Sequence, residues 1–275
     1  MAYSLAANAS RCPAAGRRLW AAGAGALLFN ITANANTPFG TAALLFNTTG
    51  SNNTAVGATA LLSNTEGHDN TANGYQALYS NTTGGGNTAN GYQALFSNTT
   101  GVRNTATGRS ALGSNMTGAA NTATGAAALA NNTDRVNNTA TGEFALTSNT
   151  TGDLNTANGR SALQTSTTGS SNTALGFAAG LGVITASNVT CIGAGVIGAD
   201  VSLTTWIGNV YGVTTQNAMT APVIVSADGQ LATVVSSERF KKDIATMEKT
   251  SEAILSLRPV TFQYKTDTRA RRSLV

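Results

Sequence analysis

The pair of residues best suited to chemistry is Ser236 with Lys241, five residues further along the chain. A serine hydroxyl becomes a nucleophile only when a base removes its proton, and lysine serves as that base only where burial depresses its pKa. Folding must therefore build a dry environment around this lysine. The spacing alone favours a serine at the start of a helix and a solvated lysine, and both interpretations stay open at this point.

The other residues that could do chemistry are scattered. Cys12 and Cys191 lie far apart without a C-x-x-C spacing, and the lone His68 has no ligand partner nearby, so we expect no metal site and no cofactor. A glycan hydrolase would need a pair of acids from neighbouring coils, but the acids of the central region are sporadic. They are Glu66, Asp69, Asp134, Glu143 and Asp153.

The composition excludes a typical packed enzyme. Only 10% of residues are charged and 6% are aromatic, and much of the 41% hydrophobic fraction is Ala, so a large core of bulky side chains cannot be built. The formal net charge of +4 comes from the ends of the chain, because residues 19–180 hold four Arg and five acids. We therefore expect no nucleic-acid partner, and we interpret the cluster of Arg269, Arg271 and Arg272 as a solvated tail.

A repeat of 17 residues dominates the chain. The segment N-T-A-N-G-Y-Q-A-L-Y-S-N-T-T-G at 70–84 recurs as N-T-A-N-G-Y-Q-A-L-F-S-N-T-T-G at 87–101, and Asn70 is taken here as position 1. The series runs without insertion or deletion from a worn copy that starts at Leu19 to about residue 180, which makes ten copies. Position 1 is Asn36, Asn53, Asn70, Asn87, Asn104, Asn121, Asn138, Asn155 and Asn172.

Each copy predicts one coil of a β-solenoid or β-roll, stacked at roughly 4.8 Å on the next. The unit is too short for a strand and a helix, but two strands of about five residues and two turns fit it. Gly at position 5 and the N-T-T-G stretch supply the turns. Because adjacent strand residues point to opposite faces, one of Ala77 and Leu78 should face the interior and the other should face outward. Association of parallel chains would then cover the outward apolar row.

After Gly180 the period fades. We expect an irregular β connector over 181–235, with a hairpin at 223–234 that turns at Asp228-Gly229. Residues 1–18 form an irregular segment and 19–180 the repeats. Residues 236–275 form a short α+β module, because Ile244, Met247, Ile254 and Leu257 suit one helical face and Val260, Phe262 and Tyr264 alternate as a strand.

The repeat unit N-T-A-x-G-x-x-A-L-x-S-N-T-T-G resembles the head repeats of trimeric autotransporter adhesins and related phage tail-fibre shafts. This resemblance implies an all-β, left-handed parallel β-roll that is wound as a homotrimer. Nothing in the chain resembles the C-terminal membrane anchor of those adhesins, so we do not expect self-export through an outer membrane.

Residues 236–244, S-S-E-R-F-K-K-D-I, are similar to the start of the self-cleaving intramolecular chaperone of phage tailspikes, tail fibres and endosialidases. Its pattern resembles S-D-x-R-x-K-x-x-I, which Ser236, Arg239, Lys241 and Ile244 match, whereas Ser237 replaces the usual Asp. The resemblance implies that Ser236 and Lys241 form a catalytic dyad that cleaves the Val235–Ser236 bond once, after trimerisation. The family domain is longer, so we expect a truncated module, and an inactive dyad stays an alternative.

The expected function is surface display and attachment by a fibre, at an extracellular, cell-surface or virion-tail location, with a cell-surface or glycan receptor as partner. One alternative is a tailspike-like solenoid that binds or hydrolyses glycans. The other is an ice-binding solenoid, because Thr recurs at positions 2, 13 and 14, although the repeat is expected to lack the flat T-x-T ranks typical of such surfaces.

The amino-terminal region leaves two interpretations of export open. Arg17-Arg18, the apolar run 19–29 and Ala33-Asn34-Ala35 imitate a signal peptide with a cleavage site. The same residues fall on the phase of the repeat, which favours a structural role. No run of about 18 apolar residues occurs, so we expect no membrane-spanning helix.

Overall fold

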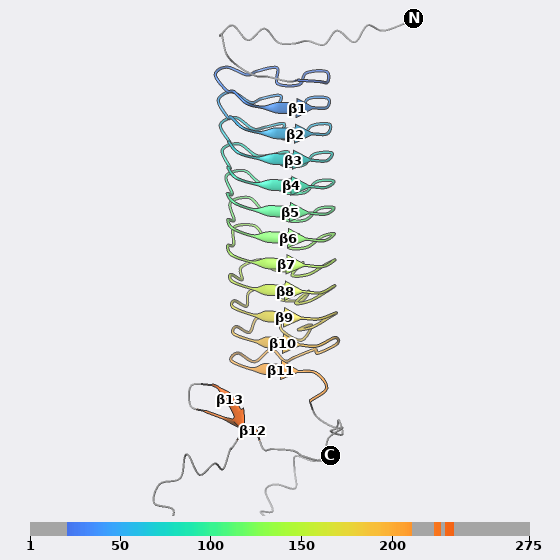
Figure 1. Cartoon of the computed structure of the whole chain (residues 1–275), viewed down its shortest axis with the longest axis vertical. Coiled ribbons are helices and arrows are strands. Elements are labelled where there is room, and N and C mark those ends of the chain that lie inside the picture. The colour runs from blue at the N-terminus through green and yellow to red at the C-terminus, as the bar shows by residue number, and fades with distance from the viewer. Residues whose placement is uncertain (1–20, 211–222, 227–228, 234–275) are drawn as a thin grey trace, which may run out of the picture. The chain divides into compact units, whose positions relative to one another are not determined.

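The computed structural model of the chain describes residues 21–210, 223–226 and 229–233 (Figure 1). The chain divides into one unit up to Val213 and a second unit from Thr214. The first unit is a stack of coils whose short strands pair side by side in one eleven-stranded sheet. The strands are β1 (Thr37–Phe39), β2 (Thr54–Val56), β3 (Thr71–Asn73), β4 (Thr88–Asn90), β5 (Thr105–Thr107), β6 (Thr122–Thr124), β7 (Thr139–Thr141), β8 (Thr156–Asn158), β9 (Thr173–Leu175), β10 (Thr190–Ile192) and β11 (Thr205–Ile207).

The sheet is parallel, and its strands follow the order of the sequence. Thr37 pairs with Thr54 and Thr54 with Thr71, so equivalent residues of successive copies lie next to each other. An isolated parallel β-bridge between Ala22 and Phe39 joins the divergent first copy to the sheet. The predicted parallel β-solenoid of 17-residue coils is confirmed, and the described residues contain no helix.

The stack continues past residue 180, where the sequence period fades. Thr190 of β10 pairs with Thr173 of β9, which keeps the 17-residue step. Thr205 of β11 pairs with Thr190, so the last described coil is 15 residues long.

Each coil holds one strand of three residues, so the prediction of two longer strands per coil was wrong. Left-handed backbone explains the difference: φ is +140° at Gly74, +56° at Gln76 and +52° at Leu78, and these residues turn the chain where the second strand was expected. Only glycine fits position 5, because a Cβ on Gly91 would lie 2.6 Å from the carbonyl oxygen of Gly108 in the next coil.

Ala and Leu at positions 8 and 9 both face the core, so the prediction that they point to opposite faces was also wrong. Ala77 and Leu78 are each 0% exposed, and the same holds for Ala94 and Leu95. The alternation rule applies to strands, whereas Leu78 has left-handed backbone that redirects its side chain inward. A single chain therefore buries both rows, and the described coils have no outward Ala or Leu row of the kind expected to drive association.

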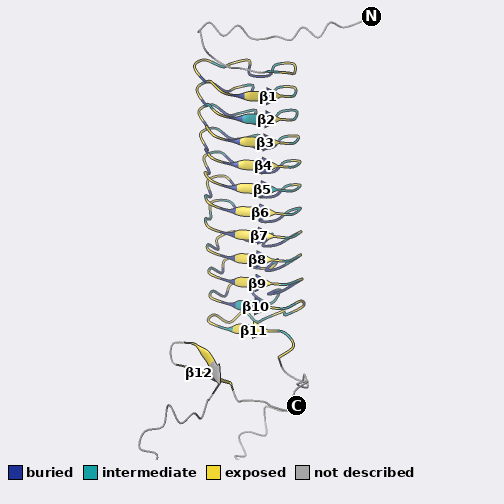
Figure 2. Ribbon diagram, viewed as in Figure 1, coloured by how far each residue is buried: buried dark blue, intermediate teal, exposed yellow. Residues whose placement is uncertain are grey.

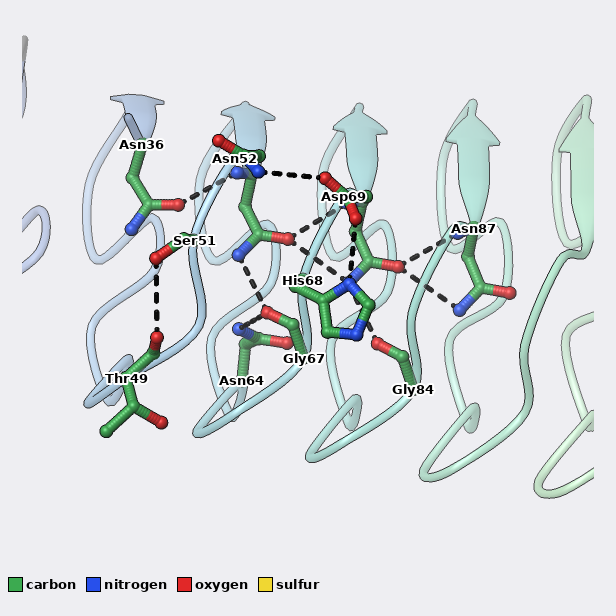
Figure 3. Close-up of polar contacts among 12 residues, drawn as sticks. Asn36, Thr49, Ser51, Asn52, Asn64, Gly67, His68, Asp69, Gly84 and Asn87 are labelled. Carbon is green, nitrogen blue, oxygen red and sulfur yellow. Dashed lines mark hydrogen bonds and ion pairs between the residues drawn. The ribbon is translucent and has the colours of Figure 1, made fainter. Parts of the chain in front are cut away.

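Two ladders of buried asparagines complete the core, and Figure 3 shows part of the position-1 ladder, from Asn36 to Asn87. At position 1, the Asn53 backbone N–H donates to Asn36 Oδ1 at 2.8 Å. At position 12, Asn64 Nδ2 donates to Asn47 Oδ1 at 2.7 Å. The side-chain amides of Asn53 and Asn64 also donate to the Gly67 carbonyl oxygen, from Asn53 Nδ2 at 2.8 Å and from Asn64 Nδ2 at 2.9 Å. The ladders satisfy polar groups that would otherwise be costly to bury, and they fix the register between coils.

Near the carboxyl-terminal end of the stack, the corner formed by positions 13 to 15 is capped. In regular coils three successive amides at positions 13 to 15, such as those of Thr48, Thr49 and Gly50, donate to one carbonyl oxygen of the next coil. In the last coil the Asp200 carboxylate takes that role, accepting from the backbone amides of Ile184, Thr185 and Ala186 at 2.7 to 2.9 Å. These bonds, first that from Ala186 and next that from Thr185, lower the pKa of Asp200 to about 2.

The second unit contains the predicted hairpin. β12 (Val223–Val225) pairs antiparallel with β13 (Leu231–Thr233), and Val225 pairs with Leu231. Gly229 has φ +84° and donates its N–H to the Ser226 carbonyl oxygen at 2.9 Å, which confirms a turn at this glycine.

Candidate functional site

The expected dyad lies outside the described residues. Val235, Ser236 and Lys241 all fall in the range 234–275, so their distances and surroundings are not part of the described structure. The described sites are surface features of the solenoid.

The most regular surface is the outer face of the sheet, defined by positions 2 and 4 of every coil. The middle residue of each strand from β1 to β10 is buried, and the flanking residues are exposed or half-buried (Figure 2). Position 2 is Thr in all eleven strands. Position 4 is polar in the middle of the sheet, where it is Asn73, Asn90, Thr107, Thr124, Thr141 and Asn158, and apolar in the strands at both ends, where it is Phe39, Val56, Leu175, Ile192 and Ile207.

This face contains the T-x-T ranks that the repeat was expected to lack. The strands β5, β6 and β7 each read T-A-T, and their threonines pair in register. The expectation was wrong because the unit was read from copies that carry Asn at position 4.

The threonines of the outer face differ from those at position 13 in their hydrogen bonding. At position 13 the hydroxyl is used inside the molecule: Thr65 Oγ1 donates to the Thr82 carbonyl oxygen at 3.1 Å, and Thr82 Oγ1 to that of Thr99 at 3.0 Å. Within the described part of the chain, the side chains at position 2 and the polar side chains at position 4 have no hydrogen-bond partner. Their hydroxyl and amide groups are free for solvent or a ligand.

A shallow hollow of about 310 Å³ interrupts the corner formed by positions 16 and 17. Gly85 and Gly86 form its floor, and His68, Asp69 and Arg103 from the two adjacent coils line it. The stacked coils thus bring together loop residues that the sequence analysis did not group. The sequence feature that could have indicated the hollow is the Gly-Gly pair at positions 16 and 17, which occurs in one copy only.

An oriented histidine lies at the edge of this hollow (Figure 3). His68 Nδ1 lies 2.8 Å from Asp69 Oδ2, and Asn52 Nδ2 donates to Asp69 Oδ1 at 3.0 Å. The contacts with His68 and then Asn52 lower the pKa of the Asp69 carboxyl. The carboxylate orients the imidazole, and with Arg103 the hollow offers both donors and acceptors to a small polar ligand.

Four of the described acids interact with other groups and form no hydrolytic pair with one another. Glu143 Oε2 bonds Arg160 Nε at 3.1 Å, Asp134 Oδ1 lies 3.1 Å from Arg135 Nε, and Asp153 Oδ1 accepts from the Val136 backbone amide at 2.8 Å. Together with the Asp69 contacts, this arrangement gives no support to a glycosidase that needs two carboxyls facing one bond.

Cys191 replaces Ala in the core of β10, where it is fully buried as a free thiol. Burial raises the pKa of the Cys191 thiol, which makes it a poor nucleophile. Among the described residues, no three His, Cys, Asp or Glu side chains are grouped as metal ligands, and no helix is long and apolar enough to cross a membrane.

Comparison with known families bears on the segment that carries Ser236 and Lys241. Residues 236–274 match the family described as the chaperone of endosialidase. The resemblance inferred for this segment is therefore confirmed. No curated protein and no solved structure matches the chain significantly. A β-solenoid followed by such a chaperone segment gives the chain the organisation of a tail-fibre-like or tailspike-like protein.

Proposed function

We propose that this chain is the subunit of a homotrimeric fibre that works outside the cell, on a virion tail or a cell surface. The solenoid is the displayed rod and binds a cell-surface or glycan receptor. The segment from Ser236 is a trimerisation chaperone that separates itself from the rod by a single cleavage.

The observation that carries this proposal is the place of the family match, which begins at residue 236, the serine of the expected dyad. A chaperone that starts at its own cleavage point can leave once the rod is assembled. Exposed aromatic pairs on the coils offer contact area for neighbouring subunits, since Phe29 and Phe46 stack at 5.4 Å and Tyr75 and Tyr92 at 5.5 Å, and all four rings are nearly half exposed.

The proposed cleavage balances with water as the co-reactant. Ser236 Oγ attacks the carbonyl carbon of Val235 while Lys241 Nζ takes the hydroxyl proton and delivers it to the departing Ser236 nitrogen. The Val235–Ser236 peptide bond breaks and an ester forms, which water then hydrolyses to a carboxylate on Val235 and a free Ser236 hydroxyl. Lys241 must be neutral for the first step, which a folded, assembled module would ensure by burial.

The test is the denatured intact mass of freshly expressed protein, wild type beside Ser236→Ala. Ser237→Ala is the matched control, because it removes the neighbouring hydroxyl. We expect wild type and Ser237→Ala to lose a fragment that begins at residue 236, and Ser236→Ala to stay whole. A wild-type chain that stays whole refutes self-cleavage, and cleavage of Ser236→Ala refutes its assignment as nucleophile.

A further inference from the structure

We propose that the outer face of the sheet, positions 2 and 4 of β1 to β11, binds the surface of ice through an ordered layer of water. This activity is independent of the proposed fibre function, because it requires only the folded solenoid.

The outer face of the sheet is regular. The register of the parallel sheet places one Thr of every coil in a single row. Coils stack at roughly 4.8 Å, and alternate residues of a strand lie about 6.7 Å apart, so positions 2 and 4 form a two-dimensional grid. From β3 to β8 every grid point is Thr or Asn. A repeating surface matches a repeating ligand, and ice is a lattice of water.

The polar side chains at the grid points can hydrogen-bond to water. Their hydroxyl and amide groups have no partner within the described residues, whereas the position-13 threonines are bonded internally. Internal hydrogen bonding therefore accounts for the threonines at position 13 but not for those at position 2. Each Thr presents a hydroxyl that can join a water network and a methyl group that orders water beside it.

The outer face of β1 to β11 is uncharged. No Asp, Glu, Lys or Arg occupies position 2 or 4 in β1 to β11, although charged residues occur at other outward positions such as Arg109 and Glu143. Charged groups hold their own hydration shells and would disturb a water lattice. A neutral face also offers no positive charge to the phosphate backbone of a nucleic acid.

The fold holds the grid in place. Single hydroxyl–water bonds release almost no net free energy, so the face must bind through many groups that are already in place. The backbone bonds between coils and the two asparagine ladders hold the grid before any ligand arrives. A soluble sugar would instead favour a concave site with a few convergent groups.

The experiment measures thermal hysteresis and inhibition of ice recrystallisation by the purified full-length chain. Thr122→Lys and Thr139→Lys each place a charge on the grid, and Thr117→Lys, at an exposed position 14, is the matched control. We expect wild type and Thr117→Lys to be active, and both grid variants to lose activity several-fold. Circular dichroism melting should show the same fold in all four, because these threonine side chains have no partner within the described chain.

Three results would overturn the proposal. The first is a folded wild-type protein without effect on ice. The second is equal activity in the grid variants and wild type. The third is a change of native mass in Thr122→Lys with an inactive wild type, which would make the face a subunit contact. None of these results bears on cleavage at Ser236, which the intact-mass experiment tests separately.

Discussion

The position-12 ladder breaks at Ser166, and restoring asparagine there should stabilise the rod. In the six regular steps between Asn47 and Asn149, each amide donates to the Oδ1 of the preceding copy at 2.7 to 3.2 Å. At the next step the residue is Ser166, and both its Oγ and Asn149 Oδ1 are buried without a partner among the described residues. Ser166→Asn would supply the missing donor.

The expected gain in the free energy of unfolding follows from the number of new hydrogen bonds. The new amide would donate to Asn149 Oδ1 and to the Gly169 carbonyl oxygen, which already accepts from Asn155 Nδ2 at 2.8 Å, as equivalent glycines do from two asparagines. Two neutral hydrogen bonds contribute about 1 kcal/mol each. The new Oδ1 would face Val183, the position-12 residue of the next coil, and its lost hydration offsets part of the gain. We expect a net stabilisation of about 1.5 kcal/mol.

The assay is urea unfolding followed by far-ultraviolet circular dichroism, with Asn98→Ala as the reverse test. Asn98 donates at 2.8 Å to Asn81 Oδ1 and accepts from Asn115 Nδ2 at 2.9 Å, so removing it leaves buried groups unpaired and should cost about 3 kcal/mol. A Ser166→Asn protein no more stable than wild type, or an Asn98→Ala protein as stable, would refute the role of the ladders.

Two further predictions concern a cap and a glycine. The lowered pKa of Asp200 means that its stabilisation is complete above the ordinary value of 3.8 and is lost as pH falls through about 2. The protection factors for hydrogen exchange at the amides of Thr185 and Ala186 should therefore fall over this window in wild type, and Asp200→Asn should abolish that fall. A linkage of about 2.5 kcal/mol, discounted for the exposed carboxylate, leaves about 1 kcal/mol. Gly91→Ala should cost about 3 kcal/mol or more in urea unfolding, because its Cβ would meet the Gly108 carbonyl oxygen at 2.6 Å. Gly113→Ala should cost less than about 1 kcal/mol, and equal costs would contradict the close approach of coils at position 5.

The coil and its stacking could be predicted from the sequence because the repeat is uninterrupted. The direction of Leu78 could not, because local rules disfavour left-handed leucine by about 1 to 2 kcal/mol. Burial of a leucine side chain contributes about 1.5 to 3 kcal/mol, so packing overrides the backbone preference in every coil. The asparagines were assigned to turns for a similar reason. Their second role appears only when stacking sets each amide next to its copy, as in Asn47 and Asn64.

The candidate sites were predicted unevenly. The T-A-T strands could have been found from Thr105, Thr122 and Thr139 and the threonines two residues after them, had every copy been compared at position 4. The hollow beside Gly85 requires knowledge of which loops stack, since His68 and Arg103 lie 35 residues apart in the sequence. The dyad of Ser236 and Lys241 stays a prediction, because its range lies outside the described residues.

The most direct test of the proposed fibre is the native mass of the Ser236→Ala chain, measured by light scattering during size-exclusion chromatography. This variant keeps its chaperone segment attached, so a single species is expected. We expect three times the chain mass of 27.7 kDa. A folded monomer at 27.7 kDa would contradict the trimeric fibre and leave a solitary solenoid.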